Sequence, residues 1–249
     1  MNLDRVIAVR NSKTVYRDGD ICLKVFDESY SKAEVLNEAL NQARVEETGL
    51  CIPKIREVTV QDGKWIIVSN YIKGKTLDRI MREDTENTEK YMQRFVSLQL
   101  EVQSRPCPLL IKQRDKLNRK IWQADFDATT RSDLLTRLES MPRHTRLCHG
   151  DFNPSNIIAC EDGQLYILDW SHATLGNASA DAARTYLLFL LDGRNDLAER
   201  YLQLFCEESG TPLSYVRKWM PIVAAAQSVE GNAMQRAMLA HWVNETDYE

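Results

Sequence analysis

The sequence predicts an α+β fold with a strand-rich N-terminal lobe and a helical C-terminal lobe. Up to Asn70 the chain consists mainly of short β-rich runs, and two Asp-Gly pairs among them are typical of hairpin turns. From Thr76 onward the apolar residues recur at the spacing of helices. Because this change of period falls near residue 73, we expect one domain over residues 1–72 and a second over residues 73–249.

The N-terminal lobe should hold one helix between two groups of strands. The helix is predicted over residues 32–48, with Gly49 suited to its C-terminal cap. The spacing predicts an apolar helix face made of Val35, Leu36, Ala39, Leu40 and Ala43. The predicted strands cover residues 3–9, 14–17, 21–26, 55–61 and 64–70.

The C-terminal lobe should consist mostly of helices. Apolar spacing predicts helices over residues 86–102 and 110–124. A further helix over residues 178–191 ends in a run that is apolar all round, so this helix should be buried. Residues 213–249 are expected to form two helices and an acidic tail.

The composition is that of an ordinary globular protein. The 249 residues are 43% hydrophobic and 27% charged, and 32 basic against 36 acidic residues give a net charge of −4. This balance argues against a nucleic-acid partner, and the absence of a long apolar run or secretory signal argues against a membrane partner. The six cysteines are scattered, which indicates reduced thiols. We therefore expect a cytoplasmic protein; its oligomeric state stays open.

Residues 149–156 and the segment after them carry the most chemistry. Asp151 and Asn156 stand five residues apart, and a hydrophobic run that follows a short hairpin ends in Asp169. Phosphoryl transfer needs one carboxylate for the proton of the attacking hydroxyl, and an amide oxygen with a second carboxylate for magnesium. The stretch is also a good turn sequence. The joint pattern favours the functional interpretation, because the hairpin returns the second Asp towards the first.

His-Gly-Asp-Phe-Asn-Pro-Ser-Asn-Ile, followed by Ile-Leu-Asp-Trp, resembles the aminoglycoside phosphotransferase and choline kinase superfamily. These are small-molecule kinases with a protein-kinase-like fold, and the resemblance covers roughly residues 15–191. It implies that Asp151 is the catalytic base and that Asn156 and Asp169 bind magnesium. It also implies that Asp181 braces the backbone of the catalytic loop.

Lys24 lies among apolar residues in a predicted strand, where a lysine can face a cleft and bind the α- and β-phosphates. Such a lysine needs a carboxylate from the following helix. The resemblance of Asn37-Glu38-Ala39 to the family's Arg-Glu-Ala favours Glu38, and Glu34, one turn earlier, is the alternative. A solvent-facing Lys24 is the other interpretation, which the presence of Asp151 and Asp169 disfavours.

The nucleotide-binding segments are less specific. The loop expected to cover the phosphates, residues 10–14, has no glycine, so Ser12 is assigned to phosphate binding by resemblance. An ordinary polar hairpin tip is the alternative. Residues 65–77 resemble the family's last strand and hinge, which implies that backbone groups near Asn70 and Ile72 bind the purine. Because main-chain groups would bind the purine, the side chains do not indicate whether the nucleotide is ATP or GTP.

The expected function is transfer of the γ-phosphoryl group of ATP, with Mg²⁺, to a hydroxyl of a small molecule such as an aminoglycoside, amino alcohol or sugar-like compound. Trp170-Ser171 stands where protein kinases have Phe-Gly, and no Ala-Pro-Glu segment follows, which favours a small acceptor. A nucleotide-binding pseudokinase and a protein kinase are the alternatives. Glu230, Trp242, Glu245 and Asp247 are candidates for the acceptor side. An acidic tail that folded over the site would suit an amine-bearing acceptor, although a solvated terminus is the more usual state of such a tail.

Overall fold

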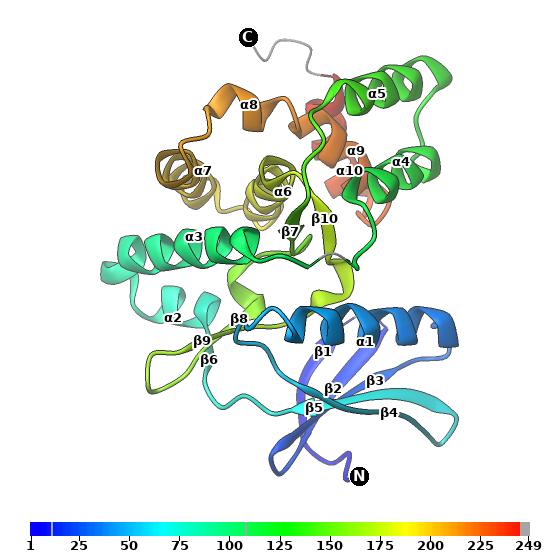
Figure 1. The fold of residues 1–249 in the computed structure, drawn as a ribbon, viewed down its shortest axis with the longest axis vertical. Helices are drawn as coiled ribbons and strands as arrows, with labels where there is room; N and C mark the ends of the chain where they lie inside the picture. Colours follow the sequence, from blue (N-terminus) through cyan, green and yellow to red (C-terminus); the bar gives the residue numbers. More distant parts are fainter. Residues whose placement is uncertain (11, 108, 245–249) are drawn as a thin grey trace. The chain divides into compact units, whose positions relative to one another are not determined.

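The computed structural model describes residues 1–10, 12–107 and 109–244 (Figure 1). Contacts divide the chain into two compact units. Unit 1 consists of Met1–Asp84 together with Pro154–Ala173, and unit 2 consists of Thr85–Asn153 together with Thr174–Glu249. The first is rich in strands and the second in helices, which confirms the predicted α+β class.

Unit 1 is built on an antiparallel sheet with the strand order β1-β2-β3-β5-β4. Two-residue turns join β2 to β3 and β4 to β5, and both Asp62 and Gly63 adopt positive φ in the second of these turns, as an Asp-Gly hairpin requires. The elements of this unit are β1 (Val6–Arg10), β2 (Lys13–Asp18), β3 (Ile21–Phe26), α1 (Lys32–Glu46), β4 (Ile55–Gln61), β5 (Lys64–Asn70), β6 (Lys75–Thr76), α2 (Leu77–Glu83), β8 (Ile157–Ala159) and β9 (Leu165–Ile167).

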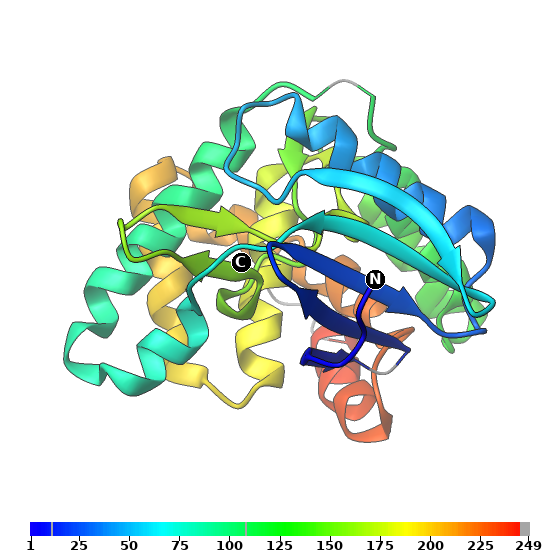
Figure 2. The ribbon, with the colours of Figure 1, turned by 90° about the horizontal axis from the view of Figure 1, so that it is seen from below.

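The alternation of side chains along β3 gives the sheet two different faces. Leu23 and Val25 pack on one face with residues of β5. Phe26 points to the other face and packs with Val35 of α1. In Figure 2 the helix α1 lies behind the strands. Since residues two apart share a face of a strand, Lys24 lies on the same face as Phe26 and therefore faces α1.

The buried face of α1 differs from the predicted one. Leu36 and Leu40 are 41% and 46% exposed, and Ala43 is exposed as well. Val35 and Ala39 are buried as predicted, and the helix also buries Glu38, Asn41 and Val45. The prediction was wrong at these leucines because the helix turns the polar Glu38 inward, and apolar spacing alone cannot anticipate a buried carboxylate.

The hairpin of β8 and β9 belongs to unit 1. It extends β6 into the order β6-β8-β9. The N–H of Ile167 donates to the carbonyl of Cys51 at 2.9 Å, which ties the hairpin to the segment between α1 and β4. This hairpin carries the segment that ends in Asp169.

Unit 2 is helical apart from the antiparallel pair β7–β10. An aromatic cluster lies in its core, where the ring of Phe95 contacts those of Phe152, Phe189 and Tyr201. Its elements are α3 (Thr88–Ser104), α4 (Gln113–Gln123), α5 (Ala128–Ser140), β7 (Arg146–Cys148), β10 (Thr174–Gly176), α6 (Ala178–Leu191), α7 (Asn195–Ser209), α8 (Leu213–Arg217), α9 (Met220–Ser228) and α10 (Ala233–Asn244).

The α6 helix is largely buried, which confirms the prediction from its apolar run. The C-terminal segment was predicted as two helices, and this was wrong, because α8, α9 and α10 are separate. Pro221 stands in the first turn of α9, where the missing N–H is tolerated, and it cannot continue a helix from α8. Over the part of the chain that the structure describes, no helix has the length and apolar character needed to cross a bilayer.

Candidate active site

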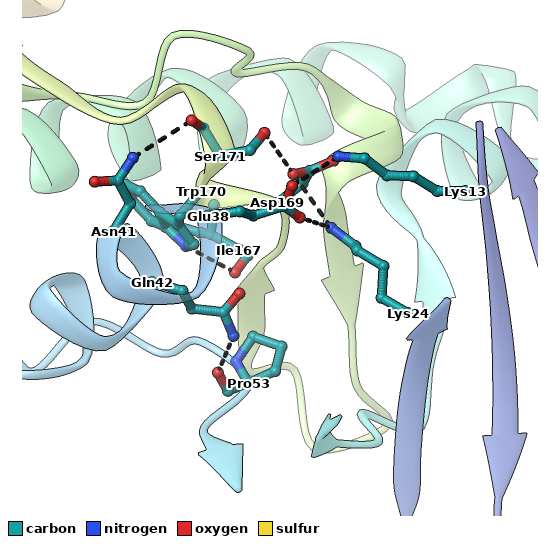
Figure 3. Close-up of polar contacts among 10 residues, drawn as sticks. All are labelled: Lys13, Lys24, Glu38, Asn41, Gln42, Pro53, Ile167, Asp169, Trp170 and Ser171. Atoms are coloured by element: carbon teal, nitrogen blue, oxygen red, sulfur yellow. Dashed lines mark hydrogen bonds and ion pairs between the residues drawn. The ribbon is translucent and has the colours of Figure 1, made fainter. Parts of the chain in front are cut away.

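Lys24 is the centre of a polar cluster in unit 1 (Figure 3). Its Nζ donates to Oε1 of Glu38 at 2.7 Å and to Oδ1 of Asp169 at 3.3 Å. The strand places the ammonium group towards α1, and the turn after β9 brings Asp169 to the same point. Residues 24, 38 and 169 therefore meet although they are far apart in the sequence.

Glu38 and not Glu34 pairs with Lys24. Glu34 forms a capping box with Ser31 at the start of α1: the Ser31 N–H donates to Oε2 of Glu34 at 2.8 Å, and the Glu34 N–H donates to Oγ of Ser31 at 3.3 Å. Glu34 is exposed, whereas Glu38 is 6% exposed. The two acidic residues thus have separate tasks, one at the helix end and one at the lysine.

Lys13 also belongs to this cluster, and the sequence analysis missed it. Its Nζ donates to Oε2 of Glu38 at 2.7 Å and lies about 5 Å from the rings of Phe26 and Tyr30. Lys13 lies within residues 10–14, the segment assigned to phosphate binding; it is the first residue of β2 and pairs with Phe26 across the strands. A lysine beside a polar loop carries no signal in the sequence, because such residues are usually solvated.

The charged groups in this cluster stabilise one another's ionised forms. Burial alone would raise the pKa of Asp169, but the charges of Lys24 and Lys13, with a hydrogen bond from Ser171, hold that pKa well below its usual range. Burial alone would lower the pKa of Lys24, but the charges of Asp169 and Glu38 raise it above its usual value. At neutral pH the cluster therefore holds a cationic Lys24 and an anionic Asp169.

Asp169 has an unusual backbone. Its φ is 59° and its ψ is 71°, a left-handed conformation that costs about 1 kcal/mol or more for a residue with a side chain. The turn is held by Trp170, which is fully buried and donates its Nε1–H to the carbonyl of Ile167 at 3.2 Å. From α1, Asn41 donates to the carbonyl of Ser171 at 3.4 Å (Figure 3). Packing thus keeps the carboxylate aimed at Lys24 despite the strain.

Asn156 and Asp169 are the residues that would hold magnesium. Asn156 is 5% exposed, and its carbonyl accepts the N–H of Leu168 at 2.8 Å, which ties its turn to the segment before Asp169. Both hydrogen-bonding contacts of the Asp169 carboxylate fall on Oδ1, and within the described residues Oδ2 has no hydrogen-bond or ion-pair partner. Amide and carboxylate oxygens suit Mg²⁺. The donor set therefore fits this metal.

No group of three or more His, Cys, Asp or Glu side chains placed to hold a metal occurs in the part of the chain that the structure describes. At a magnesium site the protein would supply the oxygens of Asn156 and Asp169. That is usual for Mg²⁺ in phosphoryl-transfer sites, where substrate phosphates and water supply the remaining oxygens.

The other residues assigned to the nucleotide lie in unit 1 as well. The N–H of Asn70 donates to the carbonyl of Lys54 at 3.0 Å. Ile72 lies two residues after the end of β5, and its part in purine binding stays a prediction. The carbonyl of Ser12 accepts the N–H of Asp27 at 3.1 Å, which holds one end of the loop over β3. Asn11, in the middle of this loop, lies outside the described residues.

Asp151 lies in a tightly held loop of unit 2. The carboxylate of Asp181 accepts the N–H of Gly150 at 2.8 Å and that of His149 at 3.3 Å. The N–H of Asp151 donates to Nδ1 of the buried His149 at 3.2 Å, and the next residue, Phe152, anchors the loop in the aromatic core. The loop is therefore fixed on both sides of Asp151, while the Asp151 side chain stays 26% exposed.

Arg184 is a second residue that the sequence analysis missed. It stands one turn after Asp181 on α6, and its Nη2 lies 4.0 Å from Oδ1 of Asp151. Of the candidates for the acceptor side, Glu230 is ion-paired with Lys120 and the ring of Trp242 contacts that of Tyr186. Glu245 and Asp247 lie outside the described residues.

Known proteins of similar sequence or structure point to one family. A family model described as the Phosphotransferase enzyme family matches residues 5–215. A search of curated protein sequences finds no match.

Solved structures share the fold. A thermostable mutant of the aminoglycoside phosphotransferase APH(4)-Ia, in a ternary complex with AMP-PNP and hygromycin B, has a TM-score of 0.68 and 15% identity over 96% of this chain and 89% of that chain. Choline kinase LicA from Streptococcus pneumoniae has a TM-score of 0.66 and 14% identity over 98% and 93% of the two chains. A choline/ethanolamine kinase family protein from Mesorhizobium loti has a TM-score of 0.65 and 12% identity over 100% and 90%. These likenesses confirm the predicted protein-kinase-like fold.

Proposed function

The chain belongs to the phosphotransferase enzyme family, and from this premise we propose that it transfers the γ-phosphoryl group of ATP to a hydroxyl of a small molecule. The observation that carries the proposal is the cluster in which Lys24 is held between Glu38 and Asp169. A lysine on a central strand, paired with a glutamate of the following helix, is the device with which protein-kinase-like enzymes bind the α- and β-phosphates.

Asp151 acts on the acceptor. Its carboxylate orients the hydroxyl and takes its proton while the hydroxyl oxygen bonds to the γ-phosphorus. The bond from that phosphorus to the bridging oxygen breaks, and ADP leaves with the electron pair. The loop contacts of Asp181 and His149 keep the base in position. A positioned general base of this kind contributes roughly 10²–10⁴ to the rate.

The residues of unit 1 act on the nucleotide. Lys24 neutralises charge on the phosphates, Glu38 orients Lys24, and Ser12 with the backbone at Ile72 positions the two ends of ATP. Asn156 and Asp169 would hold magnesium, which when bound neutralises phosphate charge and favours the leaving group. Little covalent chemistry is required of the protein, so positioning and electrostatics account for most of the catalysis.

The family and the named relatives support a small acceptor. The APH(4)-Ia structure was obtained with AMP-PNP and an aminoglycoside, and two other similar structures are described as choline or choline/ethanolamine kinases. These relatives support a small hydroxyl compound as the class of acceptor. Because their identities to this chain are low, they do not select one member of that class.

Release of ADP tests the proposal. The purified chain, with MgATP, is mixed with a panel of aminoglycosides, amino alcohols, sugars, acidic hydroxyl compounds and a protein substrate, and the phosphorylated product is identified by mass spectrometry. We expect product from at least one small molecule, and strongly reduced product from Lys24→Met and Asp151→Asn. If the natural chain released ADP no faster than Asp151→Asn with every acceptor, the chain would instead be a nucleotide-binding pseudokinase.

A further inference from the structure

Lys13 reaches the Lys24 cluster from the loop assigned to phosphate binding. Arg10 pairs with Lys13 across the hairpin of β1 and β2, so Lys13 is the first residue after the tip of this hairpin. Lys13 also pairs with Phe26 of β3. Because residues paired across antiparallel strands share a face of the sheet, the side chain of Lys13 lies on the face that carries Lys24 and faces α1.

The ammonium group of Lys13 is enclosed within unit 1. Its Nζ donates to Oε2 of Glu38 at 2.7 Å and lies 5.1 Å and 5.0 Å from the ring centroids of Phe26 and Tyr30. The Lys13 side chain is 14% exposed. Removing an ammonium group from water is costly unless other groups compensate for the lost hydration, and here a carboxylate and two aromatic rings do so. The contact is therefore formed against the usual tendency of a lysine to remain in water.

Glu38 connects Lys13 to Lys24. Lys13 donates to Oε2 of Glu38 and Lys24 donates to Oε1, each at 2.7 Å, and dashed lines in Figure 3 mark both contacts. Glu38 itself is buried on the inner side of α1. One carboxylate of the helix thus holds two lysines that come from neighbouring strands. The start of β2 is thereby tied to the position of Lys24.

The loop of residues 10–14 contains no glycine. Protein kinases use a glycine-rich loop at this place, whose backbone can approach the phosphates closely because glycine has few conformational restrictions. A loop without glycine has fewer conformations, so contacts must hold it in the one that suits the phosphates. The carbonyl of Ser12 accepts the N–H of Asp27 at 3.1 Å, which anchors the loop to the end of β3. The contact of Lys13 with Glu38 adds an anchor on α1.

We propose that Lys13 is a positioning residue for the nucleotide. Its ion pair with Glu38 anchors the loop of residues 10–14 to α1, so that one carboxylate positions both this loop and Lys24. The ammonium group of Lys13 stays on Glu38 and acts on the phosphates through the loop. The inference rests on the proposed function for the role of the loop in phosphate binding.

Calorimetric titration with AMP-PNP and Mg²⁺ tests the inference without turnover. Lys13→Met keeps the length of the side chain and removes its charge, so it should weaken AMP-PNP binding about threefold to tenfold, typical of one partly exposed charged contact. Binding of adenosine, which lacks phosphates, should stay unchanged. Lys13→Arg keeps the charge and should recover most of the affinity for AMP-PNP.

Lys64→Met is the matched control. Lys64 is an exposed lysine that is likewise the first residue of a strand after a hairpin turn. This variant should bind AMP-PNP like the natural chain.

The same titrations in the Glu38→Gln background separate positioning from direct phosphate binding. If Lys13 acts through Glu38, adding Lys13→Met to Glu38→Gln should weaken AMP-PNP binding by less than a further factor of about two. A lysine that bound a phosphate itself would keep its full effect in that background.

Hydrogen exchange of the chain without nucleotide measures the anchoring directly. The backbone amides of residues 10–14 should exchange several-fold faster in Lys13→Met than in the natural chain or in Lys64→Met, because the loop opens more often once the ion pair is lost.

Four results would each overturn the inference: unchanged AMP-PNP affinity in Lys13→Met, an equal loss of adenosine affinity, an undiminished loss in the Glu38→Gln background, or unchanged hydrogen exchange of the loop. These measurements require no acceptor. Lys13-dependent binding of AMP-PNP without phosphorylation of any acceptor would instead contradict the proposed function alone.

Discussion

Lys24 in unit 1 and Lys116 in unit 2 are both partly buried, yet their pKa values shift in opposite directions. Asp169 and Glu38 raise the pKa of Lys24 against the effect of burial. Burial lowers the pKa of Lys116 to about 7, and neighbouring cations add to that effect. The difference comes from the neighbours: Lys24 lies between carboxylates, and Lys116 lies among cations.

This contrast shows how the neighbours of a lysine decide whether burial lowers its pKa. In unit 1 the carboxylates hold Lys24 in place and charged, so an arriving nucleotide finds it already oriented. In unit 2 Arg184, Lys120 and Arg119 shift the pKa of Lys116 in the same direction as burial, and Glu230 shifts it in the opposite direction.

The largest expected effect concerns the base. Asp151→Asn should lower kcat by roughly 10²–10⁴ and leave the affinity for MgATP nearly unchanged, because the residue acts on the acceptor hydroxyl. Asp169→Asn should instead weaken magnesium-dependent nucleotide binding. Calorimetric titration with MgATP, together with ADP release, measures both. If Asp151→Asn lost nucleotide binding while Asp169→Asn kept it, the assignment of roles to the two regions would be reversed.

The next largest effect concerns the coupling between Lys24 and Glu38 in unit 1. Lys24→Met should lower kcat/KM for ATP about a hundredfold, and Glu38→Gln about tenfold through lost orientation. Because both changes disrupt the same interaction, the double variant should lose clearly less than the product of the single losses.

The control for this cycle is Glu34→Gln, whose amide can keep the capping contact with Ser31 at the start of α1. It should change kcat/KM little. Losses of Lys24→Met and Glu38→Gln that simply multiply would show that the observed ion pair has no catalytic role.

Much of the fold could be predicted from local patterns. The strands β3, β4 and β5 and the helix α6 have the predicted bounds, because strong β-rich runs, Asp-Gly turns and a continuous apolar run specify them locally. The face of α1 and the division of the C-terminal segment could not be predicted in the same way. The first depends on a buried glutamate, and the second depends on where a tolerated proline separates two helices.

The site shows the same division. Lys24 could be found because a lysine inside an apolar strand is conspicuous, and Asp151, Asn156 and Asp169 because they share one short segment. The ion pairs that join Glu230 to Lys120 and Arg184 could not be found, since Lys120 and Glu230 stand 110 residues apart and come from elements with no common motif. Only the packing of α4 and α6 with α9 brings such residues together.

The smallest expected effect concerns Lys13, the cation that joins the unit 1 cluster from β2. Glu38 accepts hydrogen bonds from Lys13 and Lys24 on different oxygens, each at 2.7 Å, so removal of Lys13 leaves the Lys24 contact in place. Lys13→Met should therefore raise the KM for ATP about threefold to tenfold, typical of one partly exposed charged contact, and change kcat little. Steady-state kinetics with varied ATP measures this. A loss of kcat as large as that of Lys24→Met would instead make Lys13 an equal partner in phosphate binding.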